Sequence, residues 1–597
     1  MSNEKKREEL GSKTISRRDF LRNTGLLAGG ATIGASLLLT GCSNENAPAS
    51  AVGSKLGLPE KWDKEVDVVV LGTGSIIPAA YKAHDAGLKV LILEKHPTYF
   101  GGTTAWCGGA VSCPNSTLAI KAGKPEIPRE IVKAYLEDCA DGQSSDELIE
   151  MMLNNYVPAI DYLINDCDFD MKYYNPSDKP SYTIYRPFSE IEKQYAGVCA
   201  TIGMNAHPDG STLGRAFRSA QKDAVEARGI EVMYGTAGKK LIYAGNPTSG
   251  DGEVVGVYAE TKSGNIAIKA RYGVIIGTGG FDHNKEMVQH YLPAPIYSTC
   301  AIETNTGDGH IMAMEVGADL RNMNESYRVA FNMVEGTDVY QASDVSRDNG
   351  TYGSEERSRV FTAPGRVGSI IVNKYGERFG NESCSYDLFG RNFEKYDTGN
   401  LEWRNIPGYL ICDKTYPGNF GSGLETMSVL LKKGELPKWI HKFDTIEELA
   451  DGMGINKNNL LATVSRYNGF CKDGVDLDWN RGVGSWDQFT CGDLARVKSG
   501  ELKNPCLAPL KEGPFYCVEI HPGMLQTKGG LVINKNAQVL NVRGEVIPRL
   551  YAGSNTIANP LGRGYGWAGG TVANGYIVGY VAGGHIATLT PWEKEKK

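Results

Sequence analysis

Residues 66–75 read Val66-Asp67-Val68-Val69-Val70-Leu71-Gly72-Thr73-Gly74-Ser75, and the predicted fold depends on this stretch. Its near-continuous apolar run is typical of a parallel strand that is buried on both faces. A helical stretch follows to about residue 86, and a second apolar run at residues 89–94 ends in an acid. A strand, a glycine turn, a helix, a strand and a terminal acid within about 30 residues form the dinucleotide-binding fingerprint.

Each position of the fingerprint has a physical role. Gly72 permits the tight turn, and Gly74 lets the backbone approach a pyrophosphate. Ser75 opens the helix, whose free N–H groups attract that anion, and Glu94 can accept hydrogen bonds from ribose hydroxyls. The third glycine of the pattern is replaced by Ile77, so we expect the helix to lie slightly further from the strand. The alternative is a structural turn that binds nothing.

The composition narrows the class of protein. The 597 residues are 41% hydrophobic and 22% charged, which is typical of globular chains. Glycine is unusually frequent, with 73 residues, about 12% against a usual ~7%. The net charge of −7 argues against a nucleic-acid surface. The 13 cysteines show no CxxC pair and no metal-ligand spacing, so we expect no metal site and no covalent c-type haem.

The first 42 residues are expected to be an export signal. Paired arginines at Arg17 and Arg18 precede a weakly hydrophobic run at residues 26–39, as in a twin-arginine signal. Residues 39–42, Leu-Thr-Gly-Cys, resemble a bacterial lipobox, in which Cys42 is acylated. A transmembrane anchor is the alternative, but the run is short for a ~30 Å hydrocarbon core. Residues 43–62 are expected to be a linker.

Four ordered motifs carry a specific resemblance. Glu94-Lys95 followed by the glycine-rich run 101–109 resembles the flavin-binding segment of the fumarate reductase/3-ketosteroid dehydrogenase superfamily. Further segments at 274–281, 369–382 and 527–555 resemble, in order, the returning strand of the FAD domain, the substrate-domain signature and the C-terminal FAD segment. The resemblance covers most of residues 63–590, and much of the glycine lies in these loops.

The resemblance implies an α/β fold: a discontinuous Rossmann-like FAD-binding domain with an inserted α+β capping domain that binds substrate. The expected boundaries are 63–295 and 500–590 for the two parts of the FAD domain, and 296–499 for the cap. FAD is the implied cofactor. The residues expected to bind it are Gly72, Gly74, Ser75, Glu94, Lys95, Gly101, Gly102, Thr103, Thr104, Gly108, Gly109, Gly279, Asp308, Asn555, Gly570 and Thr571.

The branch closest in motif is the 3-ketosteroid Δ1-dehydrogenase branch. Its Tyr-Pro-Gly-x-Gly-Gly run corresponds to residues 565–570, in which Gly566 replaces the proline and Trp567 adds bulk. The resemblance implies that Tyr565 and the Gly569 N–H bind the ketone oxygen. Tyr386 is the candidate that exchanges the proton at the neighbouring carbon. A third tyrosine is expected in the region of Tyr182 and Tyr185, and Tyr185 is the residue that we assign.

Two other functions stay open. A fumarate-, urocanate- or cinnamate-type enoate reductase would need cationic groups, but Leu525 stands where that branch has a histidine. His521, Arg391 and Arg563 are alternative cations, each also explained as a structural residue. A non-catalytic flavoprotein that carries electrons is the third possibility. His310 and Cys107 are interpreted as packing residues.

The expected substrate is a small hydrophobic ketone or enone, with no direction of reaction specified. Since the sequence lacks haem and iron–sulfur motifs, an external quinone or redox protein is expected to exchange electrons with the flavin. We expect no nucleic-acid partner, and we expect membrane contact only through an N-terminal lipid anchor on the extracytoplasmic face of the cell envelope.

Overall fold

A computed structural model describes residues 57–173, 185–195, 198, 200–333, 359–362, 365–415, 436 and 439–593. The predicted lipidation site Cys42 and the candidate Tyr182 lie outside these described residues.

Helices and strands alternate along most of the described chain. The helices are α2 (Pro78–Asp85), α3 (Thr117–Lys121), α4 (Arg129–Ala140), α5 (Asp146–Asp166), α6 (Glu190–Tyr195), α7 (Gly214–Ala227), α8 (Lys285–Tyr291), α9 (Asp308–Met314), α10 (Tyr386–Gly390), α12 (Ile446–Met453), α13 (Lys457–Asp473), α14 (Leu494–Lys498) and α15 (Gly570–Ile586). Short 3-10 turns are η1 (Gly102–Trp106), η3 (Arg391–Glu394) and η5 (Ser554–Thr556), and η4 (Asp487–Cys491) is a π-helical turn.

The strands are β1 (Lys64–Leu71), β2 (Val90–Glu94), β3 (Ala110–Ser112), β4 (Met171–Tyr173), β5 (Thr201–Met204), β6 (Glu231–Tyr234), β7 (Ala237–Asn246), β8 (Asp251–Thr261), β9 (Gly264–Ile276), β10 (Leu320–Arg321), β11 (Ser326–Met333), β12 (Arg359–Thr362), β13 (Ser369–Asn373), β14 (Tyr396–Asp397), β15 (Glu402–Trp403), β16 (Gly408–Asp413), β17 (His441–Phe443), β18 (Phe515–Thr527), β19 (Gly530–Leu531), β20 (Gln538–Leu540) and β21 (Val546–Ala552).

The predicted fingerprint forms the centre of an eight-stranded sheet with the order β20-β21-β9-β1-β2-β6, to which β7 and β8 are added beside β9. Strands β21, β9, β1, β2 and β6 run parallel, and β1 pairs with β2 on one side and β9 on the other. All five residues of β2 are buried, and β1 is buried from Val66 onward. A strand with neighbours on both edges and helices on its faces has no solvated side, which explains its unbroken apolar sequence.

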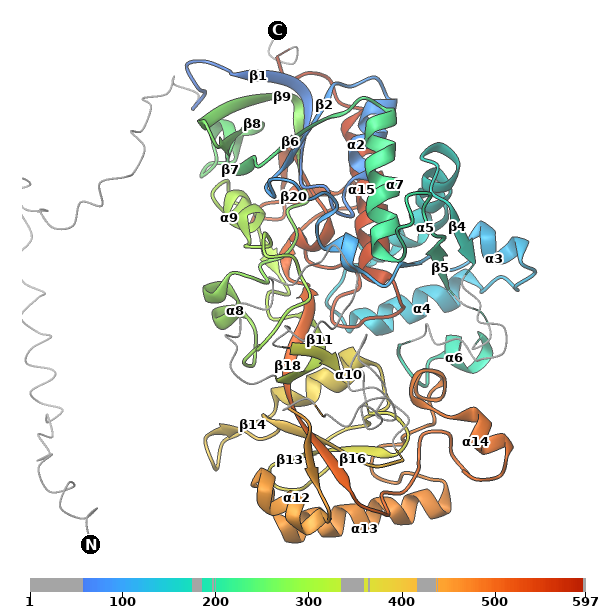
Figure 1. Ribbon diagram of the computed structural model, residues 1–597. Helices are drawn as coiled ribbons and strands as arrows, with labels where there is room; N and C mark the ends of the chain where they lie inside the picture. Colours follow the sequence, from blue (N-terminus) through green and yellow to red (C-terminus); the bar gives the residue numbers. More distant parts are fainter. Residues whose placement is uncertain are drawn as a thin grey trace, which may run out of the picture. The chain divides into compact units, whose positions relative to one another are not determined.

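Helices α2, α7 and α15 lie side by side against this sheet (Figure 1). Three glycines spaced four residues apart let α15 approach α2. A Cβ atom at Gly575 would lie 1.9 Å from Ser75 Oγ, one at Gly579 would lie 2.6 Å from the Ile76 carbonyl oxygen, and one at Gly583 would lie 2.5 Å from the Ala79 carbonyl oxygen. The close approach in which α2 takes part, made possible by these glycines, is therefore to helix α15.

The position that departs from the fingerprint is also buried. Ile76 and Ile77 are both fully buried. A Cβ atom at Gly277 would lie 2.2 Å from Ile76 Cγ2, and one at Gly553 would lie 2.3 Å from Ile76 Cδ1. Glycines at the ends of β9 and β21 thus make room for a large side chain at the start of α2.

A second, antiparallel sheet has the order β12-β11-β18-β16-β13, with β17 paired to β18. One of its hydrophobic clusters includes side chains of α12 and α13, and another includes Phe389 of α10 and Phe393. Its strands come from residues 326–527, between the segments that build the first sheet, and β18 follows residue 500. The mixed sheet confirms the predicted α/β fold, while the exact domain boundaries stay a prediction.

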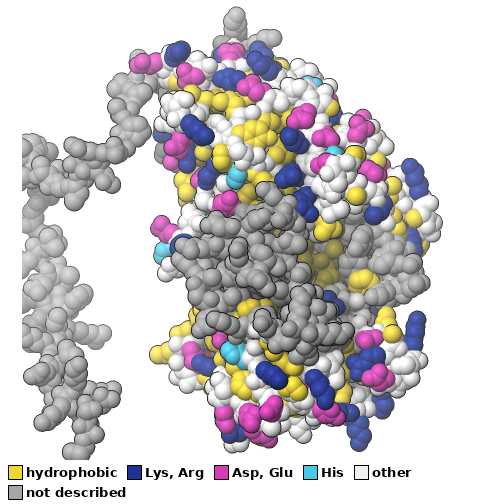
Figure 2. All heavy atoms as spheres, in the orientation of Figure 1, with side chains coloured by type: hydrophobic (Ala, Val, Ile, Leu, Met, Phe, Trp, Pro, Cys, Tyr) yellow, Lys and Arg dark blue, Asp and Glu magenta, His cyan; other side chains and the backbone are white. Residues whose placement is uncertain are grey.

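The surface drawn in Figure 2 mixes the two signs of charge, with Lys and Arg interspersed among Asp and Glu over its described part. Among the described helices, none has the length and apolar character needed to cross a bilayer.

The contact between α15 and α2 gives a test of the fold. Gly579→Ala should lower the free energy of unfolding by about 1–3 kcal/mol, because the added methyl group meets backbone that cannot yield. Gly584→Ala lies on the same helix with open space at its Cβ, and it should raise stability by up to ~1 kcal/mol. Urea titration measures both values. Equal effects at the two positions would contradict the packing described here.

Candidate cofactor and substrate site

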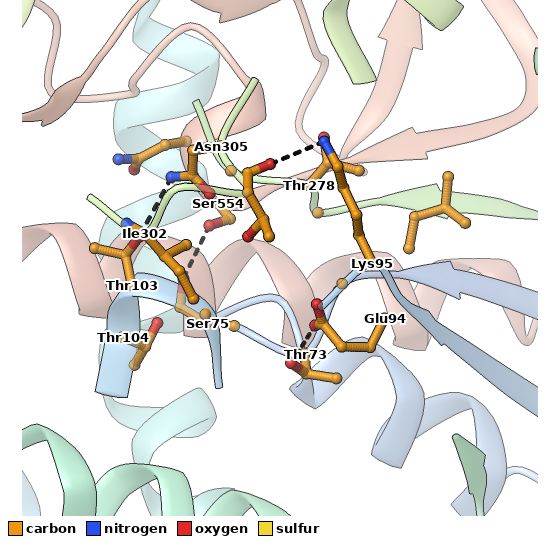
Figure 3. Close-up of a pocket in the computed structure, with 18 of the residues that line it drawn as sticks. Thr73, Ser75, Glu94, Lys95, Thr103, Thr104, Thr278, Ile302, Asn305 and Ser554 are labelled. Carbon is orange, nitrogen blue, oxygen red and sulfur yellow. Dashed lines mark hydrogen bonds between the residues drawn. The ribbon is translucent and has the colours of Figure 1, made fainter. Parts of the chain in front are cut away.

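The carboxyl ends of the parallel strands meet at a cavity (Figure 3). Residues directly after β1, β2, β6, β9 and β21 all line it, which is the position at which open α/β sheets bind ligands. The lining segments are Leu71–Ser75, Leu93–Lys95, Thr236–Gly238, Gly277–Gly279 and Ser554–Asn555.

The two glycines of the first turn serve different purposes. Gly72 has φ +100°, and a Cβ atom there would lie 2.4 Å from the Gly277 carbonyl oxygen, so the fold itself requires glycine. At Gly74 a Cβ atom would meet only ordinary contacts, 3.6 Å from Thr104 Oγ1 and 3.7 Å from the Gly101 carbonyl oxygen. Because Gly74 lines the cavity, its missing side chain leaves room for a ligand and is not demanded by the protein.

Glu94 is held rigidly at the end of β2. Its carboxylate accepts hydrogen bonds from Thr73 Oγ1 at 2.6 Å and from the His96 N–H at 2.8 Å. Thr73 Oγ1 in turn accepts from the Gly101 N–H at 2.8 Å. Burial raises the pKa of Glu94, and the hydrogen bonds from Thr73 and His96 partly oppose that rise. The turn after β1, the acid and the next glycine segment therefore form one unit.

Lys95 connects the second strand to the start of α9. Its ammonium group donates to Thr306 Oγ1 at 2.6 Å and to Asp308 Oδ2 at 2.8 Å. Lys95 and Asp308 both line the cavity. The ion pair therefore links the start of α9 to the residue after β2.

Three more hydrogen bonds order the cavity wall. Thr103 Oγ1 accepts from the Ile302 N–H at 3.1 Å and from Asn305 Nδ2 at 3.3 Å (Figure 3). Ser75 Oγ lies 3.2 Å from Ser554 Oγ, which joins the first helix to the segment after β21. Polar groups from the N-terminal and C-terminal parts of the described chain thus line the same space.

Most residues predicted to bind FAD line this cavity: Gly72, Gly74, Ser75, Glu94, Lys95, Gly102, Thr103, Thr104, Gly279, Asp308, Asn555 and Thr571. The other four do not line it: Gly101, Gly108, Gly109 and Gly570. Gly109 and Gly570 instead allow close packing, against Leu213 and against the ring of Tyr565 respectively. Contact of these four with a flavin stays a prediction.

The sequence interpretation missed several lining residues. The missed segment Thr236–Gly238 follows a short strand in which only Val232 and Met233 pack against the hydrophobic core, so no strong apolar run marks it. Gln526, which accepts a hydrogen bond from Asn555 Nδ2, lies just before the predicted C-terminal motif. The sequence marks Gln526 only by its position next to that motif.

The three tyrosines assigned to catalysis come together in one buried aromatic cluster. The hydroxyl groups of Tyr185 and Tyr386 are 3.2 Å apart. The ring centroid of Tyr565 lies 4.8 Å from that of Tyr185 and 6.0 Å from that of Tyr386. Tyr327 and Trp486 complete the cluster, with Tyr327 4.6 Å from Tyr565 between ring centroids. Residues 200 positions apart in the sequence therefore share one site.

The turn before α15 positions Tyr565 beside the cavity. Gly569 caps the helix with φ +79°, and a Cβ atom there would lie 2.4 Å from the Ala110 carbonyl oxygen. Burial raises the pKa of Tyr565 to about 12, and hydrogen bonds with Tyr386 and with Thr571, a cavity residue, oppose that rise. Trp567 is fully buried and packs on Tyr135 with a centroid distance of 4.6 Å, so its bulk lies in the core.

The cluster keeps its hydroxyl groups protonated. Burial, followed by the neighbouring tyrosines, raises the pKa of Tyr386 well above its usual value. Burial likewise raises the pKa of Tyr185, and a hydrogen bond from Tyr386 opposes it. These groups are neutral hydrogen-bond donors at physiological pH.

The cationic residues weighed for a carboxylate substrate are already paired. Arg391 lies 3.1 Å from Glu325 Oε2, and Arg563 donates to Glu325 Oε1 at 3.0 Å. His521 bonds to Glu519 at 2.5 Å. Leu525 packs against the tyrosine cluster and supplies an apolar wall there.

The two residues interpreted as structural behave as buried packing groups. His310 bonds to the Gly529 carbonyl oxygen at 3.2 Å, and burial lowers its pKa to about 4, so the ring is neutral. Burial raises the pKa of the Cys107 thiol to about 11, which disfavours a reactive thiolate. All cysteines of the described residues are free thiols.

Parallel strand ends, a buried acid and the first turn of α15 at one cavity define a nucleotide-binding α/β protein. The FAD binding domain family matches residues 67–572, and the chain belongs to this family. It is an FAD-dependent oxidoreductase that acts on carbon–carbon bonds, as predicted.

Similar proteins share nearly the whole described length. The chain is 30% identical to a 3-oxosteroid 1-dehydrogenase of Mycolicibacterium smegmatis, covering 88% of this chain and 97% of that protein. It is 30% identical to a 4-oxocyclohexanecarboxylate 2-dehydrogenase of Sinomonas cyclohexanicum, covering 87% and 92%. The crystal structure of 3-ketosteroid delta1-dehydrogenase from Sterolibacterium denitrificans with 1,4-androstadiene-3,17-dione superposes with a TM-score of 0.73 at 25% identity, covering 88% and 99%.

The cavity fits FAD chemically. The space beside Gly74 accommodates a close ligand, and the buried Glu94 suits ribose hydroxyls. The residues that would hold the cofactor are Gly72–Ser75, Glu94, Lys95, Gly102–Thr104, Thr236–Gly238, Gly277–Gly279, Asn305, Asp308, Ser554, Asn555 and Thr571.

Gly74→Ala tests this cavity. The methyl group would occupy ligand space without meeting protein closer than 3.6 Å, so we expect loss of FAD affinity of about tenfold or more while the apoprotein unfolds at an unchanged temperature. The flavin-to-protein absorbance ratio and apoprotein melting give the two readouts. Gly469→Ala is the matched control, because its Cβ meets nothing within 4 Å and the residue lies on α13, away from the cavity lining. Full flavin retention by Gly74→Ala would contradict the assignment.

Proposed function

We propose that the protein transfers hydride between FAD and a carbon beside the ketone of a flat, hydrophobic ring substrate, as a dehydrogenase or an enone reductase. The observation that carries this proposal is the buried cluster of Tyr185, Tyr386 and Tyr565, with two hydroxyl groups 3.2 Å apart. Neutral hydroxyl donors in an apolar enclosure suit a ketone, which needs no counter-ion.

When bound, FAD accepts or supplies the hydride. Tyr565 and the Gly569 N–H are the proposed donors to the ketone oxygen, where negative charge develops. Among the described residues, no group accepts the Gly569 N–H, which leaves it available to a ligand. Since Gly569 and Thr571 are two residues apart and Thr571 lines the cavity, the donors and the cofactor site share one turn.

Tyr386 is the proposed proton exchanger at the adjacent carbon, and Tyr185 is its hydrogen-bond partner. The raised pKa of Tyr386 keeps its proton in place at neutral pH, so reduction finds a loaded donor. Dehydrogenation would need the same oxygen to accept a proton, and should therefore become faster as pH rises.

Two relatives guide the substrate class. One is named for a 3-oxosteroid and the other for 4-oxocyclohexanecarboxylate, so both names place an oxo group on a six-membered ring system. A ring ketone of one to four rings is the proposed substrate of this chain. The pairing of Arg391 and Arg563 with Glu325 disfavours the enoate reductase alternative.

We further propose that residues 1–42 direct export through a twin-arginine signal, and that Cys42 anchors the protein by a lipid on the outer face of the membrane. An external quinone or redox protein would exchange electrons with the flavin. The sequence pattern around Arg17, Arg18 and Cys42 supports export, and the lack of haem and iron–sulfur motifs supports a separate electron carrier.

Removal of single hydroxyl groups tests the chemistry. Tyr565→Phe and Tyr386→Phe should each lower kcat for a ketone such as 4-androstene-3,17-dione by about 10²–10⁴-fold, because each removes a donor or a proton carrier. Anaerobic stopped-flow spectroscopy of the flavin, in both directions, measures the rates. Tyr467→Phe serves as control, since Tyr467 is buried in the core of the second sheet.

The same assay separates the alternatives. Turnover of fumarate or urocanate without turnover of ketones would overturn the proposal in favour of an enoate reductase. For dehydrogenation the wild-type rate should rise with pH toward the raised pKa of Tyr386, whereas the rate of reduction should stay level until strongly alkaline pH. Tyr386→Phe should remove this pH dependence.

Cellular fractionation tests the anchor. Cys42→Ser should move the protein from the membrane fraction to the soluble fraction, since the acylated side chain is lost, and metabolic labelling with a fatty acid should disappear with it. A membrane fraction unchanged by Cys42→Ser would contradict the lipid anchor. Ser43→Ala is the neighbouring control and should leave both readouts unchanged.

A further inference from the structure

The loop that precedes and includes η4, residues 481–491, contacts the chain segments of two catalytic tyrosines. Its central residue, Trp486, is 7% exposed and belongs to the tyrosine cluster. Its ring centroid lies 4.4 Å from that of Tyr185 and 5.9 Å from that of Tyr386. The loop is therefore in direct contact with both partners of the hydroxyl pair.

The loop is anchored to the segment that carries Tyr386. Arg481 is fully buried and donates to Ser383 Oγ at 2.8 Å and to Glu382 Oε2 at 3.3 Å. Asp487 accepts from Asn381 Nδ2 at 2.8 Å. These bonds end within five residues of Tyr386, so movement of the loop would move the segment as well.

A separate bond anchors the loop to the segment that carries Tyr185. Glu192 of α6 accepts from the Ser485 N–H at 2.6 Å and from Ser485 Oγ at 2.8 Å. Its other oxygen accepts from the Phe188 N–H. Close contact continues at Gly484, where a Cβ atom would lie 3.3 Å from Pro187 Cβ.

We propose that residues 481–491 form a clamp that sets the distance between the Tyr185 and Tyr386 hydroxyl groups, with Trp486 as its positioning residue. Trp486 contacts both tyrosines from a loop that is anchored to each of their segments. Arg481 and Asp487 of the loop bind the Tyr386 segment, and Ser485 binds the Tyr185 segment. This inference rests on the proposed function, because it takes the two tyrosines as the proton-exchanging pair.

The chemistry of Trp486 supports a role in the site. Among the described residues, no acceptor meets its buried indole N–H. The π-helical turn that starts directly after it is a geometry frequent at functional sites. A large flat ring held against two phenols restricts their rotation, and displacement of a reacting group by about 1 Å can cost about 10²-fold in rate.

Substitutions of Trp486 test the clamp in the flavin-loaded protein. Trp486→Ala should lower kcat for the ketone by about tenfold or more with KM changed less than about threefold, because the hydroxyl pair loosens while the ketone donors at Tyr565 and Gly569 remain. Trp486→Phe should restore kcat to within about threefold of wild type. Trp592→Phe changes a buried tryptophan of another hydrophobic cluster and should have no effect.

A readout without turnover keeps the clamp separate from the proposed function. In protein carrying 3-fluorotyrosine at position 386, the ¹⁹F shift and its alkaline titration should change in Trp486→Ala. They should also change in Glu192→Ala, which cuts the second anchor without touching the cluster. Glu190→Ala, on the same helix but bound to Lys193, is the control. Unchanged ¹⁹F spectra in both variants would overturn the clamp, whereas full activity of Tyr386→Phe would overturn the proposed function alone.

Discussion

Gly569 comes so close to the backbone of β3 that its missing side chain decides where α15 can start. Its left-handed conformation and the 2.4 Å approach that a Cβ atom would make to the Ala110 carbonyl oxygen leave glycine as the residue that fits. On one side of this turn Tyr565 enters the aromatic cluster, and on the other Thr571 faces the cofactor cavity. A single backbone contact therefore sets the positions of the aromatic cluster and the cofactor cavity relative to each other. The glycines along α15 then fix the helix against α2.

The charged groups around the aromatic cluster are paired or hydrogen bonded. Lys528, buried beneath the ring of Tyr327, donates to the carbonyl oxygens of Arg563 and Gly564, and burial lowers its pKa to about 8. Glu325 pairs with Arg391 and Arg563. Buried charges that are paired and hydrogen bonded hold backbone in place without presenting a free ion. The phenol groups and apolar walls of the cluster favour the proposed ketone substrate over a carboxylate.

Sequence patterns predicted the parts of the molecule that local backbone chemistry determines. The apolar pattern of the strands and the spacing of the motif predict the turn at Gly72–Gly74 and the acid at Glu94, and these residues line the cavity. Tyr565 was found through a short motif around a required glycine. Trp486 has no such signal, because its role depends on anchors from Asn381 and Glu192 that only the folded chain brings together. The packing at Ile76, beside the departing position, was equally hidden, since the glycines that make room there lie about 200 and 500 residues away at Gly277 and Gly553.

The order of the strands has a consequence for biosynthesis. Strand β21 pairs with β9 from the first half of the chain, and Asn555 and Thr571, which line the cavity, are among the last residues of the domain to leave the ribosome. Translation proceeds at about 5–20 residues per second, so the first strands wait for roughly half a minute or longer before the sheet can close. During that interval β9 lacks its partner β21, and the cavity wall is complete only once Asn555 and Thr571 have been added.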